Sequence, residues 1–168
     1  MKKTITSKRL KYPIGSLGWT NFYGASIFLT LVGVFLLITH LPIAIALSVI
    51  AIGIALYVIQ DRKLRFKSFK LNSPLDDFIE NVRKILEEDG WDVEYDNHAY
   101  IQAVNRTSLF SLDLLTIKYS KNEIKWSLVN HPESSNSIAS LISLNLKGKK
   151  TMNKIKEIAA EKSRKQLH

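Results

Sequence analysis

The sequence predicts an α+β protein in which a two-helix transmembrane hairpin precedes a small cytoplasmic domain. Two observations support this prediction. From Tyr12 to Gln60 the chain contains no Asp, Glu, Lys or Arg, so all 24 basic and 15 acidic side chains lie elsewhere. Beyond residue 72, apolar residues first recur at helical spacing and then alternate with polar ones, as in a helix followed by strands.

The shift in composition along the chain divides it into five predicted parts. The boundaries follow the outer ends of two apolar stretches within the uncharged run, the first helix-start signal and the last apolar residue of the C-terminal pattern. The parts are a basic cytoplasmic N-terminal segment at 1–21, a hairpin at 22–59, a basic connector at 60–72, an α+β domain at 73–160 and a charged tail at 161–168.

Two apolar stretches form the predicted hairpin. Phe22 to Ile38 and Ile43 to Ile59 each contain 17 residues and are separated by Thr39-His40-Leu41-Pro42. At a rise of 1.5 Å per residue, each spans roughly 26 Å of a hydrocarbon core about 30 Å thick, so flanking residues must complete each crossing. We expect antiparallel helices at about 22–39 and 42–59, because so short a turn leaves no other arrangement that satisfies the backbone in lipid.

The charges that flank the hairpin predict its orientation. Residues 1–11 hold five basic residues and no acid, residues 61–70 hold five and one acid, and residues 71–168 are balanced. Positive charge is retained on the cytoplasmic side, so both termini are expected in the cytoplasm and the chain in the cell (inner) membrane as a multi-pass protein. The predicted membrane-interface residues are Lys8, Arg9, Lys11, Trp19, Tyr23, Tyr57, Arg62, Lys63, Arg65 and Lys67.

Three other interpretations of the uncharged run remain open. Helices of 17 residues also occur buried in soluble proteins, and a hairpin can re-enter one leaflet without crossing the membrane. A secretory signal peptide is a poorer match, because the apolar run is doubled, lacks a small-residue cleavage pattern and is followed by a second basic segment.

The predicted domain begins with a helix. Ser73 and Pro74 are typical of a helix start, apolar residues recur from Leu75 to Leu86, and Gly90 suits the C-terminal cap. Four short antiparallel strands are expected next, at 91–95, 99–105, 109–119 and 123–130, with Ile124, Trp126 and Leu128 inward and Lys125 and Ser127 outward.

One or two C-terminal helices complete the domain. Apolar residues from Ile138 to Leu146 and from Met152 to Ala159 have helical spacing, with Gly148 between them and Thr151 as the expected cap of the second helix. Helices on one face of an antiparallel sheet make a small α+β layer.

The domain begins acidic and ends basic. Residues 71–96 hold nine acids and two bases, whereas residues 145–168 hold eight bases and two acids. These two ends either pair with each other or leave the basic end against anionic lipid. Lys147, Lys149 and Lys150 are therefore candidates for contact with lipid or a partner.

A search for catalytic patterns finds one candidate. The chain has no Cys, four scattered His residues and no glycine-rich phosphate loop, so neither a cofactor nor a metal is expected. Asp113 followed by Glu123-Ile124-Lys125 resembles the motif of the PD-(D/E)xK nuclease superfamily. That resemblance implies that Asp113 and Glu123 hold Mg²⁺ while Lys125 orients the attacking water. Solvated strand edges are the alternative explanation of these charges, and we favour it.

The sequence as a whole therefore favours a small, non-enzymatic integral membrane protein that presents its domain to a membrane-associated partner. The expected partners are the lipid bilayer and another membrane protein or a second copy of the chain. Nucleic acid is not expected, because the net charge of +9 comes from the two segments beside the hairpin. A membrane-tethered, nuclease-like enzyme and a lipid-binding domain are the alternatives.

Overall fold

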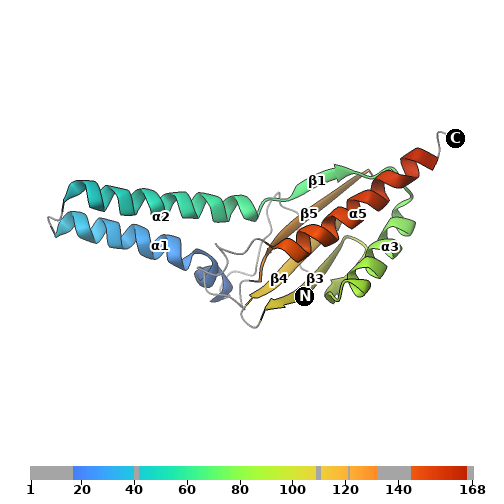
Figure 1. Ribbon diagram of the computed structural model, residues 1–168, viewed down its shortest axis with the longest axis horizontal. Coiled ribbons are helices and arrows are strands. Elements are labelled where there is room, and N and C mark those ends of the chain that lie inside the picture. Colours follow the sequence, from blue (N-terminus) through green and yellow to red (C-terminus); the bar gives the residue numbers. More distant parts are fainter. Residues whose placement is uncertain (1–16, 40–41, 109–110, 121, 132–144, 166–168) are drawn as a thin grey trace. The chain divides into compact units, whose positions relative to one another are not determined.

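The computed structural model describes residues 17–39, 42–108, 111–120, 122–131 and 145–165, which form four helices and a five-stranded antiparallel sheet (Figure 1). The chain divides into two compact units, one with the first two helices and the other with the sheet and the remaining helices. The fold class is therefore α+β, as predicted. Most of the expected N-terminal segment and of the helix at 138–146, and the last three residues of the tail, lie outside the described residues.

In the first unit, α1 (Leu17–Ile38) and α2 (Ile43–Lys63) pack against each other as an antiparallel pair. The two helices are close because glycines occupy their contact. A Cβ atom at Gly33 would lie 2.9 Å from the backbone nitrogen of Ile50, and one at Gly53 would lie 2.9 Å from that of Thr30. Small residues at a helix contact are what permits this spacing.

Both helices extend beyond the boundaries expected from hydropathy. α1 begins at Leu17 rather than at residue 22, and α2 continues through Lys63 rather than ending near residue 59. The added turn of α2 is polar, and its basic residues suit the negative end of the helix dipole. Favourable charges in the last turn therefore help to continue the helix after the apolar run has ended.

In the second unit, the five strands have the order β1-β5-β4-β3-β2, with every neighbouring pair antiparallel. The chain enters at one edge with β1, crosses to the other edge through α3 (Leu75–Glu88) and returns strand by strand before α5 (Leu146–Lys165). The strands are β1 (Lys67–Lys70), β2 (Asp92–Asp96), β3 (Tyr100–Ser108), β4 (Ser111–Tyr119) and β5 (Glu123–Asn130).

The first strand corrects the predicted organisation. The segment 60–72 is not a simple connector, because it holds the last turn of α2 and the whole of β1, and the sheet has five strands rather than about four. Two lysines in four residues gave β1 the composition of a linker. Its pairing with β5, in which Phe69 stands opposite Ile124, places Phe69 against the core.

The main core lies between α3, α5 and one face of the sheet (Figure 1). As expected, the inward residues of β5 include Ile124 and Trp126, which are buried. The largest contributions from the two helices are aromatic, branched or thioether side chains, namely Phe78, Val82 and Leu86 of α3 and Met152 and Ile155 of α5.

The opposite face of the sheet is also buried at its centre. Leu114 and Val129 on this face are almost fully buried, and Gln102 donates a hydrogen bond of 3.3 Å to Thr116. Ser127, expected to face outward into solvent, is buried there as well. The one-sided sheet predicted from alternation is therefore wrong for the central strands, which bury both faces.

The last helix begins earlier than its sequence suggests. Gly148 was expected to separate two helices and Thr151 to cap the second, but both lie inside α5. Gly148 packs closely on β5, since a Cβ atom there would come within 2.5 Å of a terminal methyl group of Leu128, which would have to shift. Thr151 is buried and bonded to neighbouring side chains rather than to a helix end.

The end of α3 agrees with the sequence. Gly90 has φ +69°, and its N–H bonds to the carbonyl of Glu87 while that of Trp91 bonds to Leu86. This pair of bonds is the Schellman motif, which requires the left-handed conformation that glycine adopts without strain.

Gly90→Ala should lower the free energy of unfolding by about 1–2 kcal/mol, because an L side chain is strained in the left-handed region. No atom within 4 Å obstructs the added methyl, so the loss reports backbone conformation alone. Denaturant unfolding of the full chain followed by tryptophan fluorescence measures it. Glu88→Ala, at an exposed position of the same helix, is the control and should change stability by less than about 0.5 kcal/mol; equal effects would contradict this explanation.

Candidate functional site

The helix pair of the first unit buries small and polar residues and exposes large apolar ones. Among the side chains described in this pair, the buried ones are Ser26, Gly33, Ala46, Gly53 and Gln60. A protein surrounded by water shows the reverse distribution. The exposed set comprises Ile27, Phe28, Leu31, Val34, Phe35, Leu37 and Ile38 of α1 and Ile43, Ile45, Leu47, Ile52, Ile54, Val58 and Ile59 of α2.

By length and composition, one of these helices qualifies as a membrane span. α2 (Ile43–Lys63) is long and apolar enough to cross a bilayer. In α1, the apolar part with described side chains, Tyr23–Ile38, is shorter. The transmembrane hairpin as a whole therefore stays a prediction.

Polar contacts join the two helices near the C-terminal end of α2, the end that is followed in the sequence by β1. Ser26 donates a hydrogen bond of 3.1 Å to the side-chain oxygen of Gln60, which has no exposed surface. The rings of Tyr23 and Tyr57 lie with centroids 5.1 Å apart. A buried amide with a partner on the facing helix fixes the register of the pair.

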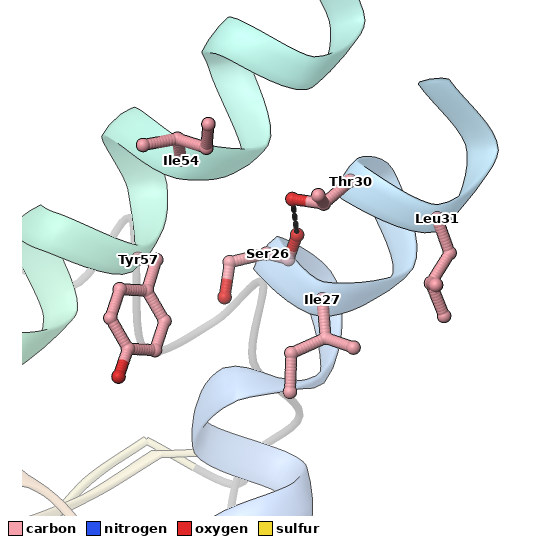
Figure 2. A pocket seen from close by; sticks show the side chains of 6 residues that line it. All are labelled: Ser26, Ile27, Thr30, Leu31, Ile54 and Tyr57. Atoms are coloured by element: carbon pink, nitrogen blue, oxygen red, sulfur yellow. Dashed lines mark hydrogen bonds between the residues drawn. The ribbon is translucent and has the colours of Figure 1, made fainter. Parts of the chain in front are cut away.

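A shallow groove of about 210 Å³ lies beside these contacts (Figure 2). Its walls come from both helices and are almost entirely apolar, because Thr30 turns its hydroxyl back to the carbonyl of Ser26 at 2.9 Å. The lining residues are Ser26, Ile27, Thr30, Leu31, Ile54 and Tyr57. The groove suits a hydrocarbon chain or an apolar side chain rather than a polar ligand.

Apart from Tyr23 and Tyr57, the predicted interface residues fall into three groups. Arg62 and Lys63 end α2, and Arg65 follows and forms a 3.4 Å ion pair with Asp61. Lys67 belongs to β1 and so to the second unit. Lys8, Arg9 and Lys11 lie outside the described residues, as does the side chain of Trp19 in α1.

The acids of the nuclease-like pattern are far apart. Asp113 stands opposite Asn130 at one end of β5, whereas Glu123 begins that strand seven residues away. At about 3.3 Å per residue this separates them by roughly 23 Å, too far to share one metal ion. Glu123 instead forms an ion pair of 3.1 Å with Lys125. Among the described residues, no three His, Asp or Glu side chains converge as metal ligands.

Asp113 instead lies in a buried polar row across three strands. Asn105 of β3 and Asn130 of β5 are its neighbours on the same face. Asp113 is fully buried, and neither carboxyl oxygen has a hydrogen-bond partner within the described part of the chain. Burial raises its pKa to about 6, although the positive charge of Lys147 opposes the shift.

The acidic start and basic end of the domain pair with each other. Asp89 accepts hydrogen bonds from Thr151 at 2.7 Å and Lys154 at 2.5 Å, and Thr151 accepts one from the indole of Trp91 at 3.1 Å. Burial raises the pKa of Asp89, but the bonds from Lys154 and Thr151 outweigh it, and the net pKa is lowered.

The three basic candidates on α5 differ in their surroundings. The ammonium group of Lys147 donates to Asn105 at 3.1 Å and is engaged within the domain. Lys149 and Lys150 are exposed. Sequence analysis missed Lys156, whose ammonium group lies 4.8 Å from the ring centroid of Trp126, beside that of Lys67 at 5.1 Å. The sequence did contain a signal for Lys156. It follows Lys149 by seven residues, or two helical turns, and this spacing places both lysines on one side of a helix.

Comparison with known proteins gives no further guide to this arrangement, since no protein-family model, curated protein or solved structure matches the chain.

The raised pKa of Asp113 predicts a pH-dependent stability. Because its folded pKa of about 6 exceeds the ordinary value of 3.8, folding favours the protonated form. That contribution is complete below pH 3.8 and is lost as the pH rises through 6. Asp113→Asn, which stays neutral, should raise the free energy of unfolding at pH 7 by about 1–3 kcal/mol.

Urea unfolding of the full chain at pH 4.5 and at pH 7.5 measures this effect. The stability difference between the two pH values should shrink in Asp113→Asn and persist in Asp92→Asn, which removes an exposed carboxyl from β2. A pH dependence that survives intact in Asp113→Asn would contradict the assignment.

Proposed function

We propose that the protein is a small integral membrane protein in which α1 and α2 anchor the α+β domain at the cytoplasmic face. The observation that supports this most directly is the reversed burial of the helix pair. Large side chains such as Phe28 and Phe35 are more than 60% exposed, while Ser26, Gly53 and Gln60 are buried. Lipid is the surrounding in which this distribution is stable, because helix association there depends on close packing and polar contacts rather than on apolar burial.

The domain itself supports a role in binding rather than in catalysis. The acids of the nuclease-like pattern are separated. The polar residues that come together around Asp113 are buried, and those around Asp89 are partly buried and bonded to one another. We therefore propose a non-enzymatic accessory module that presents its surface to a membrane protein or to a second copy of the chain.

A charge placed on the lipid-facing surface should weaken membrane insertion. Phe28→Arg is expected to cost about 2.5–3.5 kcal/mol if the position lies near the bilayer centre. The fraction of protein that stays in the membrane pellet after alkaline carbonate extraction should therefore fall. Tyr95→Arg, which adds the same charge at an exposed position of β2, is the control and should be retained like the wild type. Release of the wild type itself would overturn the proposed anchor.

The topology is tested by fusions. Reporters active only in the cytoplasm, joined separately to each terminus, should both give signal, because basic segments flank the uncharged run on both sides. A silent reporter at either end would argue against two crossings, whereas carbonate resistance would still establish insertion.

A further inference from the structure

Two lysine ammonium groups converge on one indole ring of the α+β unit. Lys67 of β1 lies opposite Trp126 of β5 in the sheet, and its Nζ is 5.1 Å from the ring centroid. Lys156 of α5 brings its Nζ to 4.8 Å from the same centroid. We call these three residues the lysine–tryptophan cluster.

Within the described residues, no carboxylate forms an ion pair with Lys67 or Lys156. The ion pairs described in this unit are Arg83 with Asp96, Lys125 with Glu123 and Lys154 with Asp89. The ring attracts both cations. An anion that accepts hydrogen bonds from both ammonium groups would neutralise their charge.

The indole holds the site in place. Trp126 is only 6% exposed and belongs to the main core, whereas Lys67 is exposed and Lys156 partly so. A buried ring that holds two lysines limits the freedom of their side chains before a ligand arrives. Less ordering is then required on binding than for two unconstrained surface lysines.

The short connection between α2 and β1 indicates which anion the cluster would meet. Lys67 is the fourth residue after Lys63, where α2 ends, so the chain between them reaches at most about 14 Å. If α2 ends at the membrane surface, as the proposed function requires, the cluster is tethered within reach of the lipid headgroups. Lys149, two turns before Lys156 on the same exposed side of α5, extends the positive surface.

We propose that the lysine–tryptophan cluster binds the phosphate group of an anionic phospholipid and so docks the α+β domain on the bilayer. The ammonium groups of Lys67 and Lys156 donate hydrogen bonds to the phosphate oxygens, and Trp126 positions both. This inference rests on the proposed membrane anchor. It adds a defined lipid contact to the basic residues that end α2.

The absence of cysteine from the chain allows a sharp test. Asn153→Cys, at an exposed position of α5 between Lys149 and Lys156, provides one site for an environment-sensitive fluorophore. The labelled full chain is reconstituted in phosphatidylcholine vesicles with increasing phosphatidylglycerol and a constant amount of lipid carrying a nitroxide on its headgroup. Quenching should rise with the phosphatidylglycerol fraction.

Substitution of the lysines should weaken this response. Lys67→Gln and Lys156→Gln should each raise the half-maximal phosphatidylglycerol fraction about fivefold, and together they should abolish the rise. Lys67→Arg with Lys156→Arg should preserve it. The charge-matched control, Lys84→Gln with Arg106→Gln, removes two exposed charges from α3 and β3, elements that contribute nothing to the cluster, and should shift the midpoint less than twofold.

Three results would overturn the proposal. They are an unchanged response in the double glutamine variant, full quenching in phosphatidylcholine alone, and relief of the phosphatidylglycerol-dependent quenching by millimolar inorganic phosphate. Binding of a labelled oligonucleotide with no response to phosphatidylglycerol would assign the cluster to nucleic acid instead.

Carbonate extraction of the same vesicles separates the proposed membrane anchor from the proposed headgroup site. Release of the wild type defeats the anchor, whereas retention without a phosphatidylglycerol response defeats only the headgroup site.

Discussion

The covalent connection between α2 and β1 constrains the rest of the molecule. Leu64 to Phe66 join them, and β1 is an edge strand of the sheet rather than a linker. Because Phe69 pairs with Ile124 and packs on the main core, the start of the domain cannot move away from the end of α2 without losing strand pairing. The domain is therefore bound to its helix by a segment a few residues long, whatever the angle between the two units.

The two units obey opposite packing rules within one chain. The helix pair buries Gly33, Gly53 and a hydrogen-bonded Gln60, whereas the α+β unit buries Phe78, Leu86 and other large side chains. In water, apolar burial drives association, and the larger side chains contribute most. In lipid that drive is absent, so close backbone approach and a few polar contacts hold helices together. The proposed membrane location explains both rules through a single difference in solvent.

Much of the fold could be predicted because strong local signals agree with the tertiary structure. The helical pattern from Leu75 to Leu86, the cap at Gly90 and the alternation in β5 are such signals. β1 was missed because its place in the sheet depends on a partner more than 50 residues away rather than on its own composition. Gly148 was misjudged for the same reason, since its close neighbour Leu128 lies on another element.

The candidate site was less predictable, because neighbouring charges in sequence do not show which of them are neutralised. The basic end of the domain contributes Lys147 and Lys154 to internal contacts with Asn105 and Asp89. Composition alone does not show that Lys154 pairs with an acid from the other end whereas Lys147 bonds to a neutral amide.

The lysines that take no part in these internal contacts are therefore the ones to consider as binding residues. Lys67 and Lys156 come from opposite ends of the domain sequence and are joined only by the ring of Trp126, which belongs to a third element. Among the described residues, the fold engages Lys147 and Lys154 internally, leaves Lys149 and Lys150 exposed, and brings Lys67 and Lys156 to one ring. Under the proposed membrane anchor, the short connection to α2 keeps this positive charge near anionic headgroups. The arrangement of charge, rather than its total of +9, is what favours a lipid contact.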